Sequence, residues 1–172
     1  MHTFVRLIER LTGNIGFVAA WVLAPLIIAT VYEVLSRYLF SAPTIWAYEL
    51  AYMATGTNYL LGMAFALRER SHIRIDVFYS RFAPKTRALI DSLGYLILFL
   101  PVTFWLSYRL GAYGLEAYFS GETSGESAWN PIIWPFRMVF FTGFAIFFLQ
   151  GLAELIKAVH IIFNKPLVDT VE

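Results

Sequence analysis

Cysteine is absent from this sequence, and charged residues are scarce. The lack of cysteine excludes disulfide bonds, thiol catalysis and metal sites that use cysteine ligands. Only 15% of the 172 residues are charged, whereas soluble domains usually carry about 25%. The net charge of +1 provides no basic field that would attract nucleic acid, so nucleic acid is not an expected partner.

Histidine is missing from the long apolar stretches. His2, His72 and His160 are all expected on the flanks of these stretches. The anchor subunit of a redox enzyme that binds haem needs histidines inside its membrane spans, so this distribution argues against that class. The sequence also lacks metal-ligand spacing, a nucleophile constellation and a glycine-rich phosphate loop. We therefore expect a chain that is not an enzyme and that holds no metal or cofactor.

Four long apolar runs dominate what is present, and 59% of all residues are hydrophobic. Runs of about 20 apolar residues are long enough to cross a membrane as helices. The sequence therefore predicts an all-α integral membrane protein, a single domain over residues 1–172, with spans at about 14–35, 45–67, 88–110 and 132–156. Amphipathic spacing predicts two short interfacial segments, at about 3–12 and 76–83. Pro25 predicts a kink in the first span.

Positive charge is concentrated between the second and third spans. Six of the thirteen Lys and Arg residues fall within residues 68–87, and ten of the thirteen lie on the same predicted side of the membrane. Because positive residues stay cytoplasmic, both termini and this central segment are expected to face the cytoplasm. Trp46, Trp129 and Trp134 then fall at the outer interface, where amphipathic rings settle. The lipid bilayer is thus one expected partner of a multi-pass protein.

The second span carries small or polar residues at steps of three or four, which places them on one helix face. They are Ala47, Ala51, Thr55, Asn58, Gly62 and Ala66. Small residues let helix backbones approach closely in lipid. Two interpretations stay open: this face packs inside the chain's own bundle, or it docks a separate subunit.

Ionisable residues cluster near the ends of the spans. Glu33 and Arg37 are four apart on one helix, but Glu49 begins the next span across a short turn, so Arg37 could pair with either acid. No buried chain of acids and no interrupted pair of helices is visible, which argues against a small transporter that works alone. Gln150 lies deeper in the last span and is expected to form a hydrogen bond across helices.

Several motifs resemble a known family. One reads R-Y-x-F…P…W…E-L, from Arg37 through Trp46 to Glu49-Leu50. The most specific match follows a G-x-A-x-A-L-R helix end at Arg68 and reads H-I-R-I-D, residues 72–76. A third, G-E-T-S, contains Glu122. The chain resembles the small membrane subunit, of the DctQ type, of tripartite ATP-independent periplasmic (TRAP) transporters.

The resemblance implies a non-catalytic scaffold in a sodium-coupled importer of organic acids, in the cytoplasmic membrane of a bacterium or archaeon. The implied partners are a large elevator-type membrane subunit, which carries the substrate and sodium sites, and a periplasmic substrate-binding protein. The implied residues are Arg37, Trp46, Glu49 and Glu122 on the outer side, and Arg68, His72, Arg74 and Asp76 in a cytoplasmic hinge. The alternative is the membrane anchor subunit of a redox complex.

Overall fold

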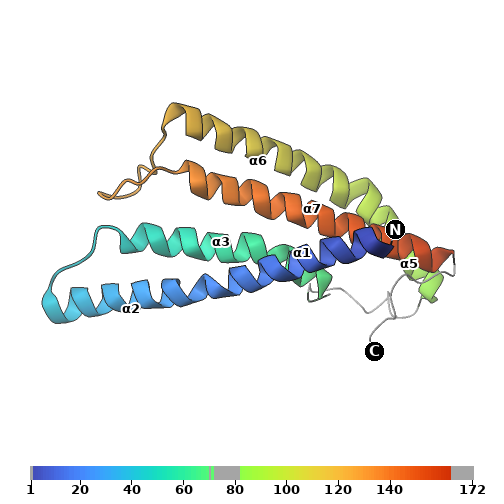
Figure 1. The fold of residues 1–172 in the computed structure, drawn as a ribbon, viewed down its shortest axis with the longest axis horizontal. Coiled ribbons are helices and arrows are strands. Elements are labelled where there is room, and N and C mark those ends of the chain that lie inside the picture. The colour runs from blue at the N-terminus through green and yellow to red at the C-terminus, as the bar shows by residue number, and fades with distance from the viewer. Residues whose placement is uncertain (1, 70, 72–81, 164–172) are drawn as a thin grey trace.

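Helices make up the structure, a computed structural model that describes residues 2–69, 71 and 82–163 (Figure 1). In chain order they are α1 His2–Trp21, α2 Leu23–Phe40, α3 Ala47–Arg68, α5 Pro84–Gly94, α6 Leu100–Ser120 and α7 Trp134–Ile162. A π-helical turn, Tyr95–Phe99, joins α5 to α6. The described residues contain no strand, which confirms the predicted all-α class.

The two ends of the bundle differ in what they carry (Figure 1). The first loop, residues 41–46, connects α2 to α3. The second loop, residues 121–133, connects α6 to α7, and both loops lie at the same end of the bundle. We call this the loop end. The start of α1, the end of α3, the start of α5 and the end of α7 lie at the opposite end, which we call the terminal end. The orientation of these two ends across the membrane stays a prediction.

Three helical stretches are long and apolar enough to cross a membrane: His2–Phe40, Pro84–Ser120 and Trp134–Ile162. The predicted second span, α3, has 22 residues, but Glu49, Asn58 and its tyrosines and threonines make it less apolar than these three stretches. The stretch of 37 residues would reach about 55 Å as a helix, well beyond a hydrocarbon layer of about 30 Å. The long stretches therefore extend past the apolar layer.

The first helix differs from the sequence-based expectation at Gly13. A separate interfacial segment at 3–12 was expected to end there, but α1 runs through Gly13 without a break. The Arg68 guanidinium occupies the space beside this glycine, and a Cβ would lie 2.5 Å from its Nη1. The predicted break is wrong: Gly13 continues the helix, and its lack of a side chain leaves room for Arg68 of α3. Val5 and Ile8 are accordingly buried in the bundle.

The helix is interrupted at Val22, between α1 and α2. Proline has no backbone N–H, so Pro25 cannot donate to the carbonyl of Trp21, four residues before it. At the interruption, the Val22 N–H is shared between the carbonyls of Val18 and Ala19, at 3.2 Å each. The break thus begins three residues before the proline at which the kink was predicted.

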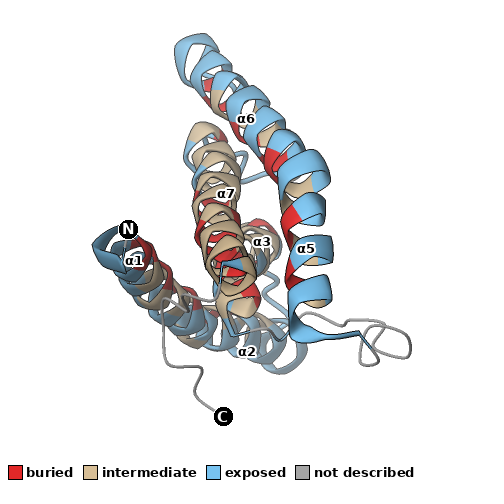
Figure 2. Ribbon diagram, turned by 90° about the vertical axis from the view of Figure 1, so that its right-hand side faces the viewer, coloured by how far each residue is buried: buried red, intermediate tan, exposed pale blue. Residues whose placement is uncertain are grey.

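Large apolar side chains face outward and small or polar ones face inward. Alanines such as Ala64, Ala117 and Ala153 are almost fully buried, whereas Phe17 and Ile28 are among many large apolar side chains that are exposed. Figure 2 shows the buried residues where the helices face each other and the exposed ones along the outer faces. Water-soluble proteins rarely expose apolar patches of this extent. Small residues at the contacts are typical of helices that pack in lipid.

Candidate functional site

The first hairpin is closed at the loop end by Glu33. The Arg37 Nε donates to Glu33 Oε1 at 2.9 Å, and the Arg37 Nη2 contacts the same oxygen. The other oxygen, Oε2, accepts from the Thr44 backbone N–H at 2.9 Å and from the Thr44 hydroxyl. The structure therefore pairs Arg37 with Glu33 and not with Glu49. One carboxylate links the end of α2 to the turn that leads into α3.

Glu49 lies at the start of α3 and is fully buried, with 0% exposure. The Ser127 hydroxyl, from the second loop, donates a hydrogen bond to Glu49 Oε1. Glu49 Oε2 has no hydrogen-bond partner among the described residues. Nearby, the Trp46 ring stacks on Tyr32 of α2 with 6.0 Å between ring centroids. Glu49 and Trp46 thus connect α3 to two different elements, although Arg37 is not part of this contact.

Glu122, in the second loop, forms an ion pair with Arg137 of α7. Two guanidinium nitrogens donate to the two carboxylate oxygens at 2.6 and 2.5 Å, a bidentate geometry that charged pairs favour. The guanidinium also lies over the Tyr113 ring, 3.6 Å from its centroid. The loop leaves α6 through Gly121, whose φ of 65° suits glycine. Glu122 therefore fixes the loop against both α6 and α7.

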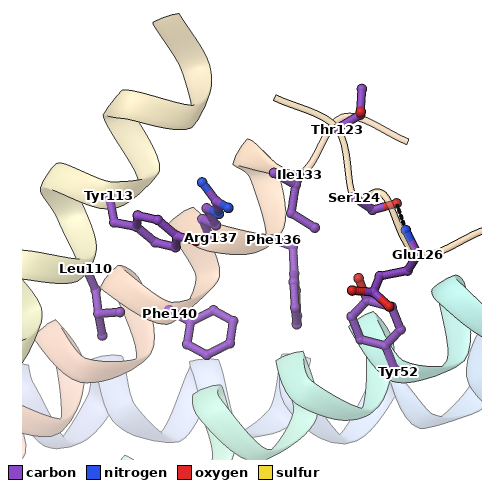
Figure 3. A pocket seen from close by; sticks show the side chains of 10 residues that line it. All are labelled: Tyr52, Leu110, Tyr113, Thr123, Ser124, Glu126, Ile133, Phe136, Arg137 and Phe140. Atoms are coloured by element: carbon purple, nitrogen blue, oxygen red, sulfur yellow. Dashed lines mark hydrogen bonds between the residues drawn. The ribbon is translucent and has the colours of Figure 1, made fainter. Parts of the chain in front are cut away.

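A cavity of about 280 Å³ lies at the loop end between α3, α6 and α7 (Figure 3). Its apolar lining residues are Leu110, Ile133, Phe136 and Phe140. Its polar lining residues are Tyr52, Tyr113, Thr123, Ser124, Glu126 and Arg137. The sequence did not predict this cavity, because its walls come from three helices and a loop that are distant in the chain.

Residues 26–160 match the family described as tripartite ATP-independent periplasmic transporters, DctQ component. The match covers most of α2, all of α3, α6 and the second loop, and nearly all of α7. The chain belongs to the DctQ family. This DctQ-family chain is therefore a small membrane subunit of a TRAP transporter, as the motifs indicated. The family is a transport component, and the match supports neither an enzyme nor a redox anchor.

The DctQ-family chain is also similar to the sialic acid TRAP transporter permease protein SiaT of Haemophilus influenzae (strain 86-028NP). The two are 25% identical over 107 residues, which cover 62% of this chain and 16% of SiaT. The chain thus spans only a small part of the length of this relative.

The small-residue face of α3 in this DctQ-family chain is only partly used inside the bundle. Ala47 is buried, and the Asn58 amide donates to the Ala19 carbonyl of α1 at 2.7 Å. Half-buried positions make up the rest of the face: Ala51, Thr55, Gly62 and Ala66. A Cβ on Gly62 would meet no atom within 4 Å. One part of this face therefore packs on α1, and another borders open space.

Only one of the four predicted hinge residues belongs to the part of the chain that the structure describes. Arg68 ends α3, packs beside Gly13 and lies 5.9 Å from the centroid of the Phe65 ring. His72, Arg74 and Asp76 lie outside the described residues, as does most of the predicted segment 76–83. The hinge therefore stays a prediction.

A buried polar network joins α1 to α7 toward the terminal end. The Thr12 hydroxyl donates to Gln150 Oε1 at 2.9 Å, and Gln150 Nε2 donates to Glu154 Oε1 at 3.0 Å. Lys157 Nζ then lies 2.5 Å from Glu154 and 2.8 Å from Glu9. The prediction that Gln150 bonds across helices is confirmed. Sequence reasoning missed Glu9, because it placed that side chain on the polar face of an interfacial helix.

Proposed function

We propose that this chain is the non-catalytic scaffold subunit of a sodium-coupled TRAP importer of organic acids. The observation that carries the proposal is the DctQ match over residues 26–160. A large membrane subunit would hold the substrate and sodium sites and move as an elevator. This chain would pack against it, keep it oriented in the membrane and perform no chemistry itself.

In this proposal the chain crosses the membrane four times, through α1–α2, α3, α5–α6 and α7, and both termini face the cytoplasm. Helix α3 supports four spans, because it lies antiparallel to α1 and α2 and packs between them and α7 (Figure 1). Two of its polar side chains bond to other parts of the chain: Asn58 to the Ala19 carbonyl of α1, and Glu49 Oε1 to Ser127 of the second loop. A span whose polar groups are satisfied by neighbouring helices tolerates lower hydropathy.

The loop end would face the periplasm and help to receive the substrate-binding protein. Three carboxylates support this role, because each ties a loop to a helix: Glu33 holds Thr44, Glu49 holds Ser127, and Glu122 holds Arg137. Preorganised surfaces bind with a smaller entropy cost than flexible ones. A loop end fixed in this way would offer the binding protein a constant surface while the large subunit moves.

Isolation of the tagged chain from its native membrane tests the subunit role. The expected result is a stable complex with one larger multi-spanning membrane protein, together with loss of organic-acid uptake when the gene for this chain is deleted. Restoring the chain on a plasmid should restore uptake. A chain that purifies alone, from cells whose uptake survives its deletion, would contradict the proposal.

A further inference from the structure

The cavity at the loop end lies where a lipid head group would meet the bundle. Helices α3 and α6 both pack on α7, and the cavity opens between them beneath the second loop. Ile133, in its wall, immediately precedes Trp134, whose ring packs edge-on against Tyr118 at 5.2 Å. Tryptophan and tyrosine concentrate at the head-group level of membranes. The position of the cavity therefore favours a membrane lipid over a soluble ligand.

The cavity carries opposite charges on two sides, Arg137 beside Tyr113 and Glu126 beside Tyr52 (Figure 3). A guanidinium has five N–H groups, and Glu122 accepts from two of the Arg137 nitrogens through one bond each. Further N–H groups of Arg137 thus stay available for an anionic oxygen. The exposed Glu126 carboxylate has no hydrogen bond or ion pair among the described residues, while its backbone N–H reaches the Ser124 hydroxyl at 3.5 Å. The cavity can therefore receive an anion at Arg137 and a cation at Glu126.

Apolar side chains line the space between these two charged sides (Figure 3). Phe136 and Phe140 pack edge-on with 5.1 Å between their ring centroids, and Leu110 of α6 also lines the cavity. A volume of about 280 Å³ holds a head group and the first carbons of an acyl chain, but not a whole lipid. The remaining part of the chain would lie along the exposed apolar surface of the helices.

We propose that this cavity binds a phospholipid whose zwitterionic head group carries a primary ammonium, as in phosphatidylethanolamine. The phosphate accepts from Arg137, the ammonium donates to Glu126, and the first acyl carbons contact Phe136. A lysine side chain from a protein partner would satisfy Glu126 but leave the Arg137 N–H groups unmatched. An anionic lipid would satisfy Arg137 but place no cation at Glu126. The proposal does not depend on the transport partners.

Native mass spectrometry of the delipidated full-length chain, with any subunit that it retains, tests this site. Phosphatidylethanolamine and phosphatidylglycerol with identical acyl chains are titrated separately. The wild-type chain should bind the ethanolamine lipid about tenfold more tightly, because only its head group forms a charge-assisted hydrogen bond with Glu126. Glu126→Gln should remove this preference. Glu126 is exposed and unpaired among the described residues, so the substitution leaves the fold intact.

Glu116→Gln is the matched control, because Glu116 is another exposed acid near the loop end that does not line the cavity. It should keep the full preference for the ethanolamine lipid. Arg137→Gln should weaken both lipids, because both carry the phosphate. Equal binding of the two lipids by the wild-type chain would overturn the proposal. So would a preference that survives Glu126→Gln, or failure of the ethanolamine lipid to bind.

Discussion

The Glu49 carboxylate depends on one hydrogen bond in a position that solvent does not reach. A buried charged or polar group is costly when its partner is removed, because its lost hydration is no longer compensated. Ser127 provides the only partner found among the described residues, and it comes from a loop 78 residues later in the chain. This contact therefore links the start of α3 to the second loop.

A double-mutant cycle on Glu49→Ala and Ser127→Ala should reveal their coupling. We expect an interaction free energy of about 1–3 kcal/mol between the two changes, since each removes the same buried hydrogen bond. Glu49→Ala and Arg37→Ala should instead add within about 0.5 kcal/mol, because Arg37 pairs with Glu33. Equilibrium unfolding of the detergent-solubilised variants measures both values.

Glu49→Gln is the control for this cycle. Its amide carbonyl can still accept the Ser127 hydrogen bond, so it should retain most of the stability lost in Glu49→Ala. A stronger coupling of Glu49 to Arg37 than to Ser127 would show that the assigned partners are wrong.

The partner of Arg37 shows what the sequence can and cannot predict for single residues. Two acids were candidate partners for Arg37: Glu33, four residues earlier on the same helix, and Glu49, across the short turn. The choice depends on the turn, in which the Thr44 N–H and hydroxyl meet Glu33. Turn geometry of this kind does not follow from spacing. Gln150, deep within a helix, was predictable because a polar amide in lipid requires a partner on another helix.

At the scale of elements, Gly143 sets how closely α7 approaches α3. A Cβ at this position would lie 2.7 Å from the Leu60 carbonyl oxygen. That oxygen belongs to helix backbone, which cannot move aside as a side-chain tip can. Close approach through small residues is a main source of stability for helices in lipid.

Gly143→Ala should therefore destabilise the chain by about 1–3 kcal/mol, the usual cost of overpacking. Thermal unfolding of the purified chain in detergent measures the loss. Gly62→Ala provides the comparison on the facing helix, because a Cβ there meets no atom within 4 Å. It should leave stability unchanged or raise it by about 0.5–1 kcal/mol, since alanine favours the helix. Equal losses in both variants would contradict this packing.

The existence of the long helices was predictable, but their ends and their partners were less so. Apolar runs located α3, α6 and α7, because lipid demands such runs. The last two continue to Ser120 and Ile162, past the predicted spans, because polar residues outside the apolar layer can remain helical. The fit of Gly13 against Arg68 depends on how two helices cross. The crossing of two helices cannot be predicted from the spacing of residues in one sequence.

For the whole molecule, we expect the loop end to face outward and the terminal end to face the cytoplasm. The natural absence of cysteine allows a direct test with single introduced cysteines. Ala128 lies at the loop end, and Ala83 lies just before α5 at the terminal end. Both positions are exposed, so each can be changed to cysteine as Ala128→Cys or Ala83→Cys. A membrane-impermeant maleimide added to intact cells should label Ala128→Cys and not Ala83→Cys.

Permeabilised cells supply the control, since both cysteines should then react. Labelling of Ala83→Cys alone in intact cells would reverse the orientation. Labelling of both there would contradict the placement of the two ends on opposite sides of the membrane.

We expect this chain to be required for transport but unable to transport by itself. The most direct test is sodium-driven uptake of a radiolabelled organic acid into liposomes, with the substrate-binding protein supplied outside. Liposomes that contain both this chain and its large membrane partner should accumulate substrate when a sodium gradient is applied. Liposomes with either protein alone should not. Uptake by this chain alone, or full uptake by the large subunit without it, would contradict the account.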